Sequence, residues 1–87
     1  MYYVYVIVDK ASGKRYLGFS SNLRKRVAQH NSSNGAEYTK GGCWNLVYYE
    51  AFLNKTEAIK REKKLKQDGR SKYQLFARIQ SSLAGQK

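Results

Sequence analysis

Five polar side chains fall where the surrounding pattern of apolar residues predicts a buried or sheet-facing surface. They are Tyr5, Tyr16, Arg26, His30 and Glu62. Burying a polar group without a partner is costly, so each of them needs a partner or a chemical task. Phenol and imidazole groups transfer protons, a guanidinium binds anionic oxygens, and a carboxylate holds a cation. The combination suits chemistry on an anionic substrate such as a phosphodiester.

The composition favours the same kind of partner. The 87-residue chain has 17 Lys and Arg against 6 Asp and Glu, which gives a formal net charge of +11 at pH 7. Such an excess favours a polyanionic partner, and nucleic acid is the first choice. A ribosome-associated protein or a merely soluble basic protein also fits the composition. The length predicts one small domain with a modest core.

Cysteine content and hydropathy predict the compartment. Cys43 is the single cysteine and cannot form an internal disulfide, and the sequence has neither a signal-peptide pattern nor a long apolar run. We therefore expect a soluble cytoplasmic protein with no membrane partner.

Three segments have the alternation, or the density of β-branched and aromatic residues, that is typical of strands. They are residues 2–8, 15–18 and 44–52. The polar turn at residues 9–14 predicts that the first two strands form a hairpin.

The alternation in the first strand separates two faces. Val4, Val6 and Val8 share one face, which is the natural core. Tyr5 is then expected on the opposite, wetter face, where Tyr16 of the second strand could join it. A tyrosine in a sheet is also explained by a simple hydrogen bond, so the case for chemistry depends on the combination.

Three helices are expected. The first runs over residues 23–31 after N-cap candidates at residues 20–22, and the polar segment 31–42 that follows is expected to be a loop. The second opens at Asn54, which forms a capping box with Glu57, and runs to Gln67.

Gly69 suits the end of the second helix, and Ser71 is a cap for a last helix with apolar residues at helical spacing up to Leu83. The order β-β-α-β-α-α predicts one α+β domain over residues 1–83, with residues 84–87 as a frayed tail.

Helical spacing places the polar residues on these helices. At about 100° per residue, His30 lies within the apolar stripe of the first helix and Arg26 borders it. Glu62 falls in the middle of the inward face of the second helix, with Ala58 and Leu65. A carboxylate there needs a cation or a metal.

The residues around the two tyrosines resemble the motifs of the GIY-YIG endonuclease family. Tyr3-Val4-Tyr5 is similar to the Gly-Ile-Tyr motif and Tyr16-Leu17-Gly18 to the Tyr-Ile-Gly motif, with eleven positions from one tyrosine to the other. The glycine of the first motif is replaced by Tyr3, and in the family only the tyrosine side chain of that motif does chemistry.

The resemblance continues along the chain over residues 2–76. Arg26 follows Tyr16 by ten residues and His30 comes four residues later, which is the family spacing. Residues 46–50 and 57–63 are similar to the small stand-alone, single-domain branch, and Glu62 matches the metal-binding glutamate.

The resemblance implies a three-stranded antiparallel sheet flanked by helices, and a metal-dependent endonuclease that hydrolyses DNA phosphodiester bonds. The enzyme would be structure-selective or weakly sequence-specific and would act in DNA repair or recombination. Glu62 would hold one Mg²⁺ or Mn²⁺ that assists the leaving 3′ oxygen, and Arg26 would bind the nonbridging oxygens. Tyr5 would orient or deprotonate the attacking water, with Tyr16 and His30 assisting.

Basic side chains around the expected site are candidates for contacts with the backbone of DNA, or of RNA. They are Lys14, Arg24, Lys25, Lys40, Lys63 and Lys66. The basic run at residues 60–66 is also explained as a solvated helix face. The sequence leaves open which group takes the proton and whether two chains pair as a homodimer.

The polar residues keep simpler explanations as well. Arg26 could form only a surface salt bridge, His30 could be a satisfied core histidine, and Glu62 could pair with Arg26 across the sheet. The alternative function is therefore a noncatalytic nucleic-acid-binding module that keeps the nuclease fold.

Overall fold

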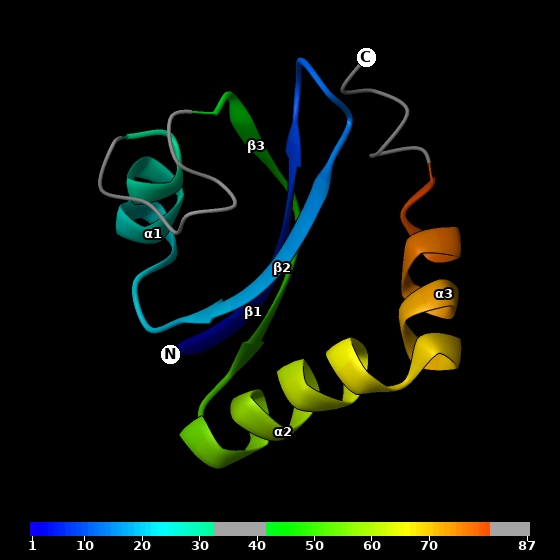
Figure 1. Cartoon of the computed structure of the whole chain (residues 1–87). Coiled ribbons are helices and arrows are strands. Elements are labelled where there is room, and N and C mark those ends of the chain that lie inside the picture. Colours follow the sequence, from blue (N-terminus) through cyan, green and yellow to red (C-terminus); the bar gives the residue numbers. More distant parts are fainter. Residues whose placement is uncertain (33–41, 81–87) are drawn as a thin grey trace.

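A three-stranded antiparallel sheet with helices on both faces forms the protein (Figure 1). The computed structural model describes residues 1–32 and 42–80. Its elements are β1 (Tyr2–Asp9), β2 (Arg15–Ser20), α1 (Leu23–His30), β3 (Trp44–Phe52), α2 (Lys55–Gln67) and α3 (Gly69–Arg78). The strand order is β2-β1-β3, so β1 is central and β2 and β3 are the edges. The predicted α+β class and element order are confirmed.

The first core lies on the valine face of the sheet, as predicted. Side chains from β1 and β2 pack there against α2 and α3, which lie together on this side (Figure 1). The buried residues of this core are Val4, Val6, Val8, Leu17, Ala58, Leu65, Leu75 and Ile79. Burial of these apolar side chains, at about 25 cal/mol per Å² of apolar surface, holds α2 and α3 on the sheet.

The opposite face is also buried, which corrects the expectation of a wetter surface around Tyr5. Tyr5 and Ile7 of β1 are completely buried there together with Trp44 of β3. They are covered by Leu23 and Val27 of α1. The apolar stripe of α1 needs a partner surface, and this face of the sheet supplies it.

A β-bulge shifts the pattern of β3. Val6 pairs with Tyr48 whereas Ile7 pairs with Leu46, so Val47 is an extra residue between them. Val47 and Tyr48 consequently both pack toward the valine core. Leu46 returns to the α1 side, although simple alternation along the strand would separate it from Tyr49.

The helix ends differ from expectation in two places. α1 ends at His30, and the Asn31 side chain exchanges two hydrogen bonds with the backbone N–H and C=O of Trp44, which ties the helix end to β3. α3 begins at Gly69 with Asp68 as its N-cap, three residues before the predicted cap Ser71. The Asp68 carboxylate accepts from the Arg70 N–H and from the Ser71 hydroxyl, so the acidic side chain takes the capping role.

Other expectations lie outside the described residues. These concern most of the loop over residues 31–42, the helix as far as Leu83, and the tail at residues 84–87. Within residues 1–32 and 42–80, none of the helices has the length and apolar character that crossing a membrane requires.

A side-chain network links β3 to α2. Arg61 donates through Nε to Glu50 Oε1 at 2.8 Å and through Nη2 to Glu50 Oε2 at 2.9 Å, and the Tyr48 hydroxyl donates to Glu50 Oε2 at 2.7 Å. The Glu50 side chain is 19% exposed and that of Arg61 28%. Burial opposes the charge of Glu50, but the hydrogen bonds from Arg61 and Tyr48 hold the pKa of Glu50 below its usual value. The bidentate pair therefore fixes α2 along the sheet.

We expect Arg61→Met to lower the free energy of unfolding by about 2 kcal/mol, because it leaves the Glu50 carboxylate without its charged partner. Urea denaturation measures the change. Lys60→Met is the matched control, since Lys60 is exposed on the same helix, and we expect it to stay within about 0.5 kcal/mol of the unchanged protein. Equal effects of the two substitutions would show that the pair does not stabilise the fold.

Candidate active site

Tyr5 and His30 form the buried centre of the site. The Tyr5 hydroxyl lies 2.6 Å from His30 Nε2, in a hydrogen bond whose donor depends on the imidazole tautomer. Tyr5 lies in the middle of the central strand and His30 at the end of α1, and both side chains are completely buried. His30 is therefore buried within the stripe of α1, as its helical spacing predicted, and its hydrogen-bond partner is Tyr5, another of the predicted site residues.

Gly18 makes room for the Tyr5 ring. It pairs with Tyr5 across β1 and β2. A Cβ at this position would lie 2.6 Å from the Tyr5 hydroxyl oxygen, 2.8 Å from Tyr5 Cζ and 2.9 Å from Tyr16 Cε2. The glycine of the second motif is therefore required by the close approach of two tyrosine side chains.

Tyr16 extends the site to the β2 edge of the sheet. Its ring centroid lies 6.4 Å from that of Tyr5 and 4.8 Å from that of His30. On α2, the Lys66 ammonium lies 5.8 Å from the centroid of the Tyr16 ring. The two predicted tyrosines thus converge, and the half-buried Tyr16 connects the buried pair to the surface.

Arg26 lies one turn before His30 on α1 and is half-buried. Its Nη1 donates to Gln29 Oε1 at 3.1 Å. The Arg26 charge acts on Tyr5, Tyr16 and His30, so the guanidinium is near all three. Sequence analysis missed Gln29, although its i, i+3 spacing from Arg26 is that of a helical side-chain pair.

Glu62 approaches from α2, on the other face of the sheet. Ala58 and Leu65 occupy the buried face of that helix, whereas Glu62 borders it with its side chain 22% exposed, so the prediction that Glu62 lies in the middle of the inward face is wrong. Its Oε2 lies 3.2 Å from Lys66 Nζ in an i, i+4 ion pair. Lys66, rather than Arg26, is the observed cationic partner.

Glu62 is nevertheless close enough to act on Tyr5, since its charge contributes to the raised pKa of the phenol. Lys66 contacts both the Glu62 carboxylate and the Tyr16 ring. The structure therefore brings the five predicted site residues near one another around Tyr5 and Tyr16, with α1 and α2 on opposite faces of the sheet (Figure 1).

The electrostatics of the buried pair define its protonation. Burial raises the pKa of Tyr5 to about 12, against the opposing effect of Arg26. Burial, and then the charge of Arg26, lower the pKa of His30 to about 4. At neutral pH the pair is therefore a protonated phenol beside a neutral imidazole.

A metal would have few protein ligands here. Within the part of the chain that the structure describes, no three His, Cys, Asp or Glu side chains cluster to hold an ion. Glu62 offers one hard oxygen ligand, which fits a Mg²⁺-type ion that keeps water and substrate oxygens as its other ligands. The Lys66 partner is 48% exposed, so this ion pair is weak and can give way to a cation.

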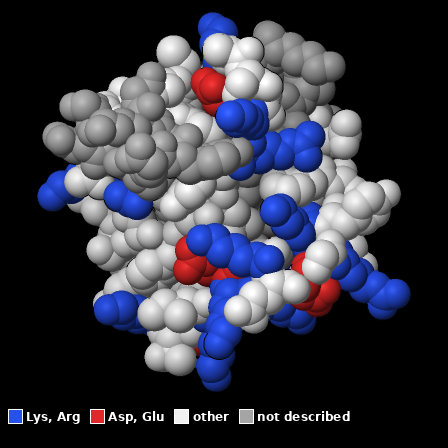
Figure 2. Space-filling view, in the orientation of Figure 1, with Lys and Arg blue, Asp and Glu red and all other residues white. Residues whose placement is uncertain are grey.

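The basic residues that were predicted to contact nucleic acid lie on the surface wherever the structure describes them. Lys14, Arg24, Lys25, Lys63 and Lys66 are exposed, and Lys40 lies outside the described residues. Figure 2 shows Lys and Arg spread over one face, with acidic side chains visible only beside basic ones. A polyanion would meet a predominantly positive surface on this face.

The comparison with protein families identifies a nuclease-type domain. The family model of the GIY-YIG catalytic domain matches residues 1–74. The chain belongs to the GIY-YIG family.

Its relatives are small proteins of similar length. A UPF0213 protein of Halobacterium salinarum is 40% identical over 72 residues, which cover 82% of this chain and 92% of that protein. A UPF0213 protein of Clostridium perfringens is 48% identical over 63 residues, 71% of this chain and 67% of that protein. The solution NMR structure of a UPF0213 protein from Bacillus halodurans superposes with a TM-score of 0.54 at 36% identity, covering 88% of this chain and 84% of that one.

We expect Gly18→Ala to destabilise the protein by about 1–3 kcal/mol and to displace the Tyr5 ring, because both tyrosines are too close to accept a methyl group. Thermal unfolding measures the first effect, and the NMR shifts of the Tyr5 and His30 rings measure the second. Gly69→Ala is the control, since a Cβ at Gly69 meets nothing within 4 Å. A Gly18→Ala protein with unchanged stability and ring shifts would contradict this account.

We expect acid to destabilise the fold through His30. The pKa of His30 is about 4 in the folded state and 6.5 in a free histidine, so its contribution is complete above pH 6.5 and is lost as the pH falls toward 4. This predicts a loss of about 2 kcal/mol in the free energy of unfolding between pH 7.5 and pH 5. Urea denaturation at each pH measures it. His30→Phe should be less stable than the unchanged protein at pH 7.5, and its free energy of unfolding should not change between pH 7.5 and pH 5. If the free energy of unfolding of His30→Phe still falls over this range, the loss does not come from His30.

Proposed function

We propose that this protein is a metal-dependent endonuclease that hydrolyses phosphodiester bonds in DNA. The observation that carries the proposal is the Tyr5–His30 hydrogen bond of 2.6 Å, with the Arg26 charge acting on both groups. A permanent cation beside a phenol and a neutral imidazole suits attack by water on an anionic phosphorus centre.

Tyr5 and His30 act as a proton relay in this proposal. With a pKa of about 12 the Tyr5 phenol keeps its proton at neutral pH, so it cannot act as a preformed base. The neutral His30 can accept that proton at Nε2 while the Tyr5 oxygen takes a proton from the attacking water. The water oxygen then bonds to phosphorus and the bond from phosphorus to the 3′ oxygen breaks. The 3′ oxygen takes a proton from solvent, and His30 holds the proton that the water lost.

Arg26 stabilises the charge that develops on the nonbridging oxygens. Its planar guanidinium stays positive at any working pH and can bind two oxygens at once. Gln29 accepts from its Nη1, and the guanidinium also interacts with the hydroxyls of Tyr5 and Tyr16. Tyr16, between the Tyr5–His30 pair and Lys66, lies where its hydroxyl can help to position the water or the phosphate.

Glu62 is the residue that would hold the divalent ion. When bound there, Mg²⁺ or Mn²⁺ would supply positive charge for the leaving 3′ oxygen. Lys66 holds the Glu62 carboxylate at the β2 edge, on the α2 side of Tyr16. The nucleophile side and the leaving-group side of the reaction are thereby assigned to α1 and α2.

The basic surface supports DNA as the substrate, through contacts that are largely independent of sequence. Lys14, Arg24, Lys25 and Lys63 are the exposed candidates for these contacts. We propose weak sequence specificity or selection of DNA structure, with a role in DNA repair or recombination in the cytoplasm.

The test is nicking of supercoiled plasmid and of branched DNA with Mg²⁺ or Mn²⁺, and with EDTA. We expect cleavage only with metal, and a loss of about 10²–10³-fold in rate for Arg26→Ala and for Glu62→Gln. Tyr5→Phe should lose activity to a similar degree, because the phenylalanine ring keeps the packing but has no hydroxyl.

Glu57→Gln is the matched control for Glu62→Gln, since Glu57 is an exposed glutamate on the same helix. DNA binding in EDTA should persist in all of these variants. Binding without metal-dependent cleavage would reject the nuclease and support the noncatalytic nucleic-acid-binding module. Equal cleavage by the unchanged protein, Arg26→Ala and Glu62→Gln would reject the site.

A further inference from the structure

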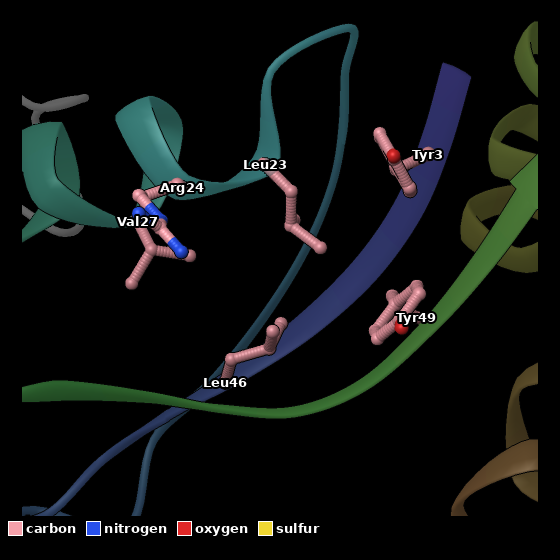
Figure 3. Close-up of a pocket in the computed structure, with 6 residues that line it drawn as sticks. All are labelled: Tyr3, Leu23, Arg24, Val27, Leu46 and Tyr49. Carbon is pink, nitrogen blue, oxygen red and sulfur yellow. The ribbon is translucent and has the colours of Figure 1, made fainter. Parts of the chain in front are cut away.

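A groove of about 430 Å³ lies between α1 and the sheet (Figure 3). β1 and β3 form its floor and α1 one wall. The residues that line it are Tyr3, Leu23, Arg24, Val27, Leu46 and Tyr49. Its volume is within the range of about 300–1,000 Å³ that is typical of small-ligand sites.

The lining is aromatic and apolar but open to solvent. The Tyr3 and Tyr49 rings meet edge to face, with centroids 5.8 Å apart and planes inclined by 71°. Tyr49 is 53% exposed and Leu46 37% exposed. The β-bulge at Val47 brings Leu46 to this face. Exposed apolar side chains gathered in a groove are typical of a binding site.

The charge of the residues that line the groove indicates which kind of ligand it fits. Arg24 is exposed and is the one charged residue among the six that line the groove, and none of the six is acidic. An apolar groove with a cation at its rim fits a ligand that combines a flat apolar ring with a negative charge. A nucleotide of an unstacked strand has this combination, and stacking on a tyrosine accepts any base.

The groove and the candidate active site share two elements, β1 and α1. Tyr3 and Tyr5 lie two residues apart on the same face of β1. On α1, Leu23 and Val27 line the groove and also pack against Tyr5, while His30 of the same helix contacts Tyr5 and Tyr16 and the Arg26 charge acts on Tyr5. A strand with one phosphate at Arg26 can therefore pass beside α1 and place a neighbouring nucleotide against Tyr49.

We propose that the groove binds an unstacked base of the nucleic-acid strand that the active site cuts, with Arg24 contacting an adjacent phosphate. The proposal rests on the proposed nuclease function and deepens it, because it makes a single-stranded segment part of the substrate. Base stacking is worth about 1–3 kcal/mol per base. The groove therefore favours single-stranded regions over an intact duplex.

The test compares a single-stranded oligonucleotide containing 2-aminopurine with a duplex of the same sequence. Binding is measured by fluorescence anisotropy in EDTA, so that no cleavage occurs. We expect Tyr49→Ala to weaken single-strand binding about tenfold and to change duplex binding less than about twofold. Quenching of 2-aminopurine on binding should be lost in the same variant.

Three further variants make the result specific. Tyr49→Phe keeps the ring and should bind as the unchanged protein does. Tyr73→Ala removes a tyrosine of 75% exposure from α3, outside the groove, and should have no effect. Arg24→Ala should weaken single-strand binding and lower its salt dependence by about one phosphate contact.

Each outcome decides the proposal. Unchanged single-strand binding by Tyr49→Ala, or an equal loss for the duplex, overturns it. A concentration-dependent dimer that Tyr49→Ala abolishes, with no effect on nucleic acid, overturns it in favour of a second copy of the chain. Tyr49-dependent single-strand binding without cleavage under any metal supports the groove while rejecting the nuclease function.

Discussion

The hydrogen bond between the Tyr5 hydroxyl and His30 Nε2 depends on complete burial of both side chains, and the rest of the site depends on it. It joins the central strand to the last turn of α1, so the helix cannot move along the sheet without leaving two buried polar groups unpaired. Gly18 allows the approach from the β2 side. The same burial that stabilises α1 keeps the phenol protonated and the imidazole neutral. The contact between Tyr5 and His30 therefore determines both the packing of α1 on the sheet and the protonation states of the two side chains.

The edge position of β2 explains how a small domain can combine groups from both faces of a sheet. Around a central strand, the neighbouring strands would separate side chains of α1 from those of α2. Tyr16 lies on an edge strand, so His30 of α1 and Lys66 of α2 both contact its ring. The buried groups suit proton transfer, and the half-exposed Arg26 and Glu62 suit charged ligands that arrive from solvent.

Local pattern was sufficient to predict the class and the element order, because alternation, helical spacing and the cap at Asn54 are all encoded within a few positions. The five candidate site residues were selected from the same pattern together with the motif spacing, and their roles belong to the proposed function. The burial of Tyr5 was not predictable in this way, since it results from α1 covering a face that looks polar along β1. The ion pair between Glu62 and Lys66 was not predicted because the Glu62 carboxylate was expected to point inward. Asp68 was not predicted as the N-cap of α3 because Ser71, three residues later, is an equally good capping residue. The groove could not be predicted because it depends on the β-bulge in β3, and the spacing of residues in the sequence does not indicate that bulge.

Because of that bulge, the number of residues in β3 determines which side chains face α1, as much as the residue types do. Val47 is the residue that lets Trp44 and Leu46 share a side of the sheet with Tyr49. A relative with one residue fewer at this point would turn the first half of the strand over and would direct Asn45 to α1 in place of the buried indole. Single-residue insertions and deletions here are therefore expected to be rarer among such proteins than changes of residue type.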